Sequence, residues 1–238
     1  MKMEAEHEGF SHRNLPYFLK DTAQILRYLK ELSDEDLKSI WQTSEKLAQL
    51  NINRIRSMDL KNKLTPAILS FQGLQYQYIG AQVLSYEELD YLEEHLCILS
   101  GFYGLLKPLD GVLPYRLEMK STFKNWEYAN LYEFWGNKLA LKIQSESSTL
   151  LNLASKEYSQ VISKYLTKDT RMIDFVFGEL IDGRVKQKAT LLKMARGEMV
   201  QFLAANQVTE IDQIKEFNQQ GYVFSEEFSE PNYFVFIK

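Results

Sequence analysis

Met172-Ile173-Asp174-Phe175-Val176-Phe177 is the stretch of sequence that decides the fold. All of its residues except the aspartate are apolar, which is typical of a strand buried inside a sheet. Asp182-Gly183 follows closely, and this dipeptide favours the tight turn of a β-hairpin. The pattern therefore predicts a buried strand, a turn and a returning strand over residues 185–192.

Other short apolar runs predict the rest of the sheet. They lie at residues 150–154, 221–224 and 233–237, and we expect the last two to pair. No repeat and no linker rich in glycine, serine or proline interrupts the chain. With the helices described next, these runs predict an α+β fold, with a mixed sheet surrounded by helices in one compact domain over residues 1–238.

Helix starts can be read from their caps. Residues 33–36 place a hydroxyl before three acids, Ser85 and Glu88 form a capping box, and Asn130 with Glu133 is a weaker start. The second of these helices is expected to carry four leucines on one face: Leu89, Leu92, Leu96 and Leu99. The third is expected to run through Phe134, Leu139 and Ile143. Residues 194–206 and 209–217 also have helical spacing.

Composition excludes several classes of protein. The chain has 238 residues, of which 45% are hydrophobic, and its net charge is −4. Its one cysteine, Cys97, allows no intrachain disulfide, which fits a reducing compartment. The first eight residues are polar and acidic, unlike a signal peptide, and no run of about 18 apolar residues exists. We therefore expect a soluble cytoplasmic protein that does not interact with membranes.

The usual catalytic and metal-binding motifs are missing. The sequence has no Walker A motif, no G-x-G-x-x-G and no G-x-S-x-G. His95 and Cys97 are two residues apart on an expected helix, about 200° around its axis, so they cannot hold one metal ion together. His7 and His12 lie in a polar start. We expect neither a metal site nor a cofactor.

Two glycines, Gly101 and Gly104, bracket an aromatic pair just after the expected end of a helix at Ser100. Such glycines can present a nest of N–H groups to a phosphate, as in helix-hairpin-helix modules that bind the DNA backbone. They can equally form a helix C-cap that turns into a core strand. Local sequence favours the second interpretation.

Charged residues offer two further candidates. Arg116 could bind a carboxylate or phosphate through two parallel hydrogen bonds, while Glu118 could form with it an acid–base pair or, as we favour, a structural ion pair. Residues 184–196 carry five cations and no acid. A solvated strand face and an anion-binding surface both explain that run.

Six motifs in order resemble the YaaA family of bacterial peroxide-stress proteins. They are Leu99-Ser100-Gly101-Phe102-Tyr103-Gly104-Leu105-Leu106-Lys107-Pro108-Leu109-Asp110, Pro114-Tyr115-Arg116-Leu117-Glu118-Met119, Leu131-Tyr132-Glu133-Phe134-Trp135-Gly136, Asn152-Leu153-Ala154-Ser155-Lys156-Glu157-Tyr158, Lys193-Met194-Ala195-Arg196-Gly197 and Phe217-Asn218-Gln219-Gln220-Gly221-Tyr222-Val223-Phe224. Together they cover nearly the whole chain.

The resemblance implies a cytosolic protein that limits free intracellular iron under peroxide stress. It also implies a helix-hairpin-helix-like element, carried over to Gly101–Gly104, and a positively charged cleft that binds DNA weakly and without sequence preference. The residues it assigns to DNA binding are Gly101, Phe102, Tyr103, Gly104, Lys107, Tyr115, Arg116, Lys193 and Arg196.

The sequence departs from the family pattern in two places. Members usually open with a short apolar strand and Pro-Ala-Lys, which this chain lacks, so we expect either a start downstream of the true one or the loss of a central strand and a cleft lysine. Gln160 also stands where a lysine is usual. Both changes remove positive charge.

Two other function classes stay open. One is an enzyme acting on a nucleotide or nucleic-acid base. In such an enzyme Arg116 and the basic run would hold phosphate, and Glu118 or Asp110 would be the acid–base group. Tyr103 or Tyr115 would stack on the base. The other is a scaffold that binds a protein partner.

Overall fold

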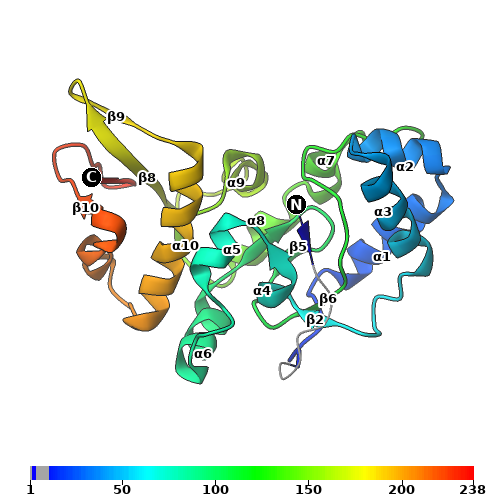
Figure 1. Cartoon of the computed structure of the whole chain (residues 1–238), viewed down its shortest axis with the longest axis horizontal. Coiled ribbons are helices and arrows are strands. Elements are labelled where there is room, and N and C mark those ends of the chain that lie inside the picture. The colour runs from blue at the N-terminus through cyan, green and yellow to red at the C-terminus, as the bar shows by residue number, and fades with distance from the viewer. Residues whose placement is uncertain (1, 4–10) are drawn as a thin grey trace. The chain divides into compact units, whose positions relative to one another are not determined.

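The computed structural model describes residues 2–3 and 11–238. His7 and most of the acidic start lie outside the described residues. The chain forms two compact units, each built from three separate stretches. The first unit comprises Met1–Gln72, Leu96–Leu139 and Lys156–Ile162, and the second comprises Gly73–His95, Ala140–Ser155 and Ser163–Lys238. Figure 1 traces the elements of both along the chain.

The first unit is mainly helical. Its helices are α1 (Leu19–Glu31), α2 (Asp34–Trp41), α3 (Glu45–Ser57), α4 (Ala67–Ser70), α7 (Leu131–Trp135) and most of α9 (Lys156–Ser163). Its strands are β1 (Lys2–Met3), β2 (Thr65–Pro66), β3 (Phe71–Gln72), β4 (Ile98–Ser100), β5 (Gly104–Leu106) and β6 (Gly111–Val112). They form three antiparallel two-stranded pairs: β1 with β3, β2 with β6, and β4 with β5.

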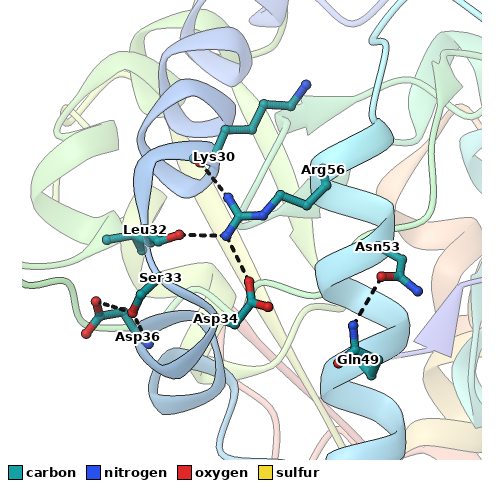
Figure 2. A network of polar contacts seen from close by, with 8 residues as sticks. All are labelled: Lys30, Leu32, Ser33, Asp34, Asp36, Gln49, Asn53 and Arg56. Carbon is teal, nitrogen blue, oxygen red and sulfur yellow. Dashed lines mark hydrogen bonds and ion pairs between the residues drawn. The ribbon is translucent and has the colours of Figure 1, made fainter.

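Arg56 of α3 fixes the junction between α1 and α2 (Figure 2). Its guanidinium donates to the carbonyls of Lys30, at 2.5 Å, and Leu32, at 2.7 Å, and lies 2.9 Å from Asp34 Oδ1. These contacts satisfy carbonyls that the end of a helix leaves without partners. Ser33 then caps α2 by accepting from the N–H of Asp36, which confirms the predicted helix start.

The second unit contains the sheet. Its strands follow the order β10 (Val223–Phe224), β11 (Tyr233–Ile237), β8 (Arg171–Ile181) and β7 (Thr149–Asn152), and β9 (Arg184–Lys186) also pairs with β8. Strands β7 and β11 run parallel to β8, whereas β9 is antiparallel to β8 and β10 to β11. The prediction of an α+β fold with a mixed sheet is therefore confirmed.

The predicted strand and its turn are also confirmed. Residues 172–177 lie within β8, and both Asp182 (φ 53°) and Gly183 (φ 70°) have the positive φ that a type I′ hairpin turn requires. The returning strand is shorter than predicted. It ends at Lys186, because Ala189 begins helix α10 (Ala189–Ala205).

The helices of the second unit are α5 (Leu74–Ile79), α6 (Tyr86–His95), α10, and the 3₁₀ segments η1 (Ile211–Glu216) and η2 (Gln219–Gly221). Gly197 lets α10 approach α5 closely, because a Cβ there would lie 2.3 Å from the Gln75 carbonyl oxygen. Helix α8 (Lys138–Gln144) begins in the first unit and continues in the second.

Two helix predictions were wrong in extent. Helix α6 ends at His95, so Leu96 and Leu99 do not continue its face, and Leu99 lies in β4. The helix predicted from Asn130 is two helices, α7 and α8, because Gly136 adopts φ 49° and ψ −128° between them. Within the described part of the chain, no helix is both long enough and apolar enough to cross a membrane.

Candidate nucleic-acid interface

The Gly101–Gly104 segment is a β-hairpin turn. Strands β4 and β5 flank it and pair antiparallel, with Ser100 opposite Gly104. The prediction that this segment is the hairpin of a helix-hairpin-helix element is therefore wrong, because strands and not helices flank the turn. The other interpretation was a helix C-cap that turns into a core strand. The segment does lead into a buried strand, β5, but a strand and not a helix precedes it.

The aromatic residues of this hairpin belong to the interior of the first unit. Phe102, Tyr103 and Tyr115 are 0%, 1% and 2% exposed. The Tyr115 hydroxyl lies 2.6 Å from Ser100 Oγ, and Tyr103 OH accepts from the Leu113 N–H at 3.0 Å. Burial raises the pKa of Tyr103. These rings hold the hairpin in place and present no face to a ligand.

The two glycines make room for neighbouring groups. A Cβ on Gly101 would lie 2.8 Å from the Leu117 carbonyl oxygen, and one on Gly104 would lie 2.9 Å from the Trp135 ring. Trp135 Nε1 donates to the Gly101 carbonyl at 2.9 Å. The need for glycine here is explained by packing.

Lys107 and Asp110 form the next turn. The Lys107 N–H donates to Asp110 Oδ2 at 2.9 Å, and the Asp110 N–H donates to the Lys107 carbonyl at 3.2 Å. Asp110 is 4% exposed, so this carboxylate supports the backbone of the turn.

Arg116 and Glu118 form an ion pair in the first unit, with Arg116 Nη2 3.3 Å from Glu118 Oε1. Their side chains are 19% and 32% exposed, so the pair is partly shielded from solvent. Burial raises the pKa of the Tyr158 phenol, and the negative charges of Glu157 and Glu118 raise it further. The predicted ion pair is present, and a second carboxylate and a phenol lie near it.

Glu157 and Tyr158 were not selected as site residues from the sequence, although they end one of the six motifs. Glu157 Oε1 accepts from the Lys120 N–H at 3.3 Å, and its carbonyl accepts from Tyr132 OH at 2.9 Å. A Glu-Tyr pair at the start of α9 carries no signal that distinguishes it from an ordinary first turn.

Lys193 and Arg196 lie on α10 in the second unit. Their spacing of three residues puts them on adjacent turns of one helix face. Lys193 is exposed, whereas Arg196 is half-buried and its Nε is fully covered. Burial lowers the pKa of the Arg196 guanidinium, and the charge of Asp174 opposes that shift.

Acids from β8 and its turn partly balance the basic run. Lys188 Nζ lies 2.8 Å from Glu179 Oε2, and Lys186 Nζ lies 3.7 Å from Asp182 Oδ2. The sequence of residues 184–196 contains no acid, but the hairpin places these two carboxylates opposite it. Arg184 and Lys193 have no ion-pair partner among the described residues.

The predicted DNA-binding residues thus divide between the units. Those from Gly101 to Arg116 lie in the first, and Lys193 and Arg196 lie in the second. No group of three or more histidine, cysteine or carboxylate side chains in residues 2–3 and 11–238 is arranged to hold a metal ion.

Comparison with known proteins agrees with the resemblance seen in the motifs. A family model described as peroxide stress protein YaaA matches residues 1–228. A UPF0246 protein of Pediococcus pentosaceus is 46% identical over 237 residues, covering 100% of this chain and 94% of the relative. A UPF0246 protein of Lachnoclostridium phytofermentans is 49% identical over 223 residues, covering 94% and 88%. The chain belongs to the YaaA family of peroxide stress proteins.

Proposed function

We propose that this protein acts in the cytoplasm against hydrogen peroxide by limiting free intracellular iron, and that it binds DNA weakly and without sequence preference. Membership of the peroxide stress protein YaaA family supports the first part. The basic run of residues 184–196 supports the second. The buried hairpin at Gly101–Gly104 does not support it.

The observation that carries the DNA proposal is the exposed charge of Arg184 and Lys193. Neither has an ion-pair partner among the described residues, so neither must give up an internal contact to meet a phosphate. Lys186 and Lys188 are paired only on the surface, where an ion pair contributes little. A phosphate backbone can therefore replace the acids at small cost.

Such binding has a defined salt dependence. Each phosphate neutralised releases a counterion, so about four contacts give a slope of about −4 for log affinity against log salt. No recognition helix is proposed, so the affinity should not depend on base sequence. This separates the proposed contacts from specific DNA recognition.

A salt titration by fluorescence anisotropy tests the proposal, with duplexes of several sequences. Lys193→Ala should make the slope shallower by about one unit for every duplex. Lys46→Ala is the matched control, since Lys46 is exposed on α3 of the first unit, and should leave the slope unchanged. Undetectable binding of the folded protein at low salt would reject the DNA part.

A cellular experiment tests the iron part. Cells without the gene should show more chelatable iron by electron paramagnetic resonance and lower survival in hydrogen peroxide, and this chain should restore both. Restored survival with unchanged iron would contradict iron limitation while leaving the stress role in place.

A second candidate is an enzyme acting on a nucleotide or nucleic-acid base. The Arg116–Glu118 pair favours it, because a partly exposed arginine can also bind a phosphate and an adjacent carboxylate can transfer a proton. Tyr103 and Tyr115 are too deeply buried to stack on a base, and Asp110 is held in its turn. Glu118→Gln should abolish turnover and spare DNA binding if this candidate is correct.

A further inference from the structure

An open pocket lies in the second unit, lined by η1, by residues of β8, β10 and β11, and by the loop of residues 225–232 that joins β10 to β11. Its volume is about 470 Å³, and small-molecule sites ordinarily have volumes of about 300–1,000 Å³. All of its lining residues belong to the second unit. None of the residues considered above for DNA binding or catalysis lines it, so the pocket is a separate candidate site.

The floor of this pocket is apolar. Phe234 of β11 is 4% exposed and Phe224 of β10 is half-buried, and their rings meet edge to face with centroids 5.3 Å apart. Ile211 and Pro231 add further apolar surface to the lining. Aromatic rings in this arrangement can pack against an aliphatic or aromatic group. The floor can therefore bury the apolar part of a ligand.

Two of the charges in the lining neutralise each other. Lys215 Nζ lies 2.7 Å from Asp212 Oδ1 within η1, and it also lies 5.6 Å from the centroid of the Phe224 ring. An ammonium that is already paired in this way offers little net charge to a ligand. Recognition of a charged ligand therefore depends on the other ionised side chains of the pocket.

Glu226 and Glu230 present two exposed carboxylates to the pocket, and neither forms an ion pair with a residue that the structure describes. The loop that carries them is held by its own hydrogen bonds. Ser229 Oγ donates to the Ser225 carbonyl at 2.6 Å and accepts from the Val235 N–H at 2.9 Å. A loop ordered before binding reduces the entropy that a ligand must overcome. The two carboxylates are therefore preorganised to receive a cation.

Arg171 contributes the opposite charge to the same pocket. Its Nε donates to Asn232 Oδ1 at 2.9 Å and its Nη2 donates to the Pro231 carbonyl, which fixes the plane of the guanidinium. A guanidinium has five N–H donors, so donors remain for a ligand. No nitrogen of Arg171 lies within 4.0 Å of a carboxylate oxygen of Glu226 or Glu230. Cation and carboxylates therefore line one pocket without forming ion pairs with each other.

We propose that this pocket binds a free amino acid with an apolar side chain. Arg171 binds the α-carboxylate, because its planar fork can donate two parallel hydrogen bonds to one carboxylate. Glu226 and Glu230 bind the α-ammonium group, and Phe224 and Phe234 contact the side chain. A simple anion would face two carboxylates, and a simple amine would leave the arginine without an acceptor. An apolar amino acid satisfies the cation, the carboxylates and the floor together.

Thermal unfolding of the whole chain with added L-phenylalanine tests the proposal, because a ligand of the native state raises the melting temperature in proportion to its affinity. Three compounds each lack one group: glycine lacks the side chain, phenethylamine the carboxylate and 3-phenylpropanoate the ammonium. Each should bind about 10-fold more weakly than L-phenylalanine. No shift with L-phenylalanine at millimolar concentration would overturn the site. Equal shifts with all four compounds would overturn the assigned contacts.

The double variant Glu226→Gln/Glu230→Gln keeps the size of both side chains and removes their charge. It should lower the affinity for L-phenylalanine and phenethylamine about 10-fold without weakening the binding of 3-phenylpropanoate. Glu227→Gln is the matched control, because Glu227 is exposed in the same loop but does not line the pocket. It should change none of the affinities. An equal loss for all ligands, or the same loss in the control, would refute the role of the two carboxylates.

Arg171→Met should have the complementary effect. It should weaken the binding of L-phenylalanine and 3-phenylpropanoate about 10-fold and leave that of phenethylamine unchanged. Arg171 also holds the loop through Asn232, so Arg171→Lys, which keeps the charge but not the fork, is the second variant. It should bind L-phenylalanine with an affinity between those of the wild type and Arg171→Met. An Arg171→Met protein that keeps its affinity for L-phenylalanine would refute the carboxylate contact.

Discussion

Gly104→Ala should lower the free energy of unfolding by about 2–5 kcal/mol, and two costs add to this figure. Gly104 has φ 74°, and the left-handed region costs a residue with a Cβ about 1–2 kcal/mol. The new Cβ would also lie 2.9 Å from both Leu139 Cδ2 and Trp135 Cη2, and overpacking of a core costs about 1–3 kcal/mol.

Trp135 has little freedom to move away from that Cβ. It is 0% exposed, its ring packs against Phe18 and Phe134, and its Nε1 is bound to the Gly101 carbonyl. Relaxation by rotation of the indole would therefore break a buried hydrogen bond. This is why we expect the packing cost to be retained in full.

Urea unfolding followed by circular dichroism measures the effect. Gly221→Ala is the control, because Gly221 has φ 79° and nothing within 4 Å of the Cβ position, so it should cost only the backbone term of about 1–2 kcal/mol. An equal loss in both variants would refute the packing argument. Folded Gly104→Ala should bind DNA with the wild-type salt slope, and a shallower slope would return the hairpin to the interface.

Three further substitutions have expected outcomes. Trp135→Phe should lower the free energy of unfolding, measured in urea, by about 1–3 kcal/mol, because the buried Gly101 carbonyl loses its donor. Trp126→Phe, at a half-buried ring, should lower it less. Burial raises the pKa of Glu198 above its ordinary value of 4.5, so the protonated carboxyl stabilises the fold below that value and the stabilisation is lost as the pH rises through the raised pKa. Glu198→Gln should therefore be more stable than the wild type at pH 7. The difference in stability should vanish below about pH 4. Cys97→Ser should leave survival in hydrogen peroxide unchanged, because no second cysteine can resolve a sulfenic acid, and a large loss at normal protein level would contradict this.

Sequence predicted the parts of the fold that local chemistry determines. The capping box is present as read, with the Ser85 N–H 2.7 Å from Glu88 Oε2 and the Glu88 N–H 3.1 Å from Ser85 Oγ. The Asn130 cap and the Asp182-Gly183 turn also form as expected. In each case the interacting groups are at most three residues apart, so the sequence contains both partners.

The Gly101–Gly104 hairpin could not be predicted in the same way. A glycine pair around two aromatic residues fits both a phosphate nest and a helix cap that turns into a core strand, and the sequence favours the second without predicting a strand on both sides. The choice is made by the Leu117 carbonyl and the Trp135 ring, which occupy the space beside the glycines from 16 and 31 residues further along the chain, counted from Gly101 and Gly104 respectively. A local pattern cannot encode what fills the space beside it.

The basic run shows that the number of cations in a sequence predicts an anion-binding surface less well than the number of partners that the fold gives those cations. Residues 184–196 present five cations in the sequence, but the fold gives Lys188 a carboxylate at 2.8 Å and leaves Arg196 half-buried with none. An exposed cation without a partner is fully hydrated and costs nothing, so Lys193 and Arg184 alone require no ligand. The covered Nε of Arg196 is closed to a ligand as well as to water, so burying it without an acceptor costs free energy that the rest of the fold must offset. Arg196→Met removes this donor and keeps an apolar stem, so it should raise the melting temperature of the protein. A lower melting temperature of Arg196→Met than of the wild type would contradict this, because it would mean that the guanidinium stabilises the fold by more than its unsatisfied Nε costs.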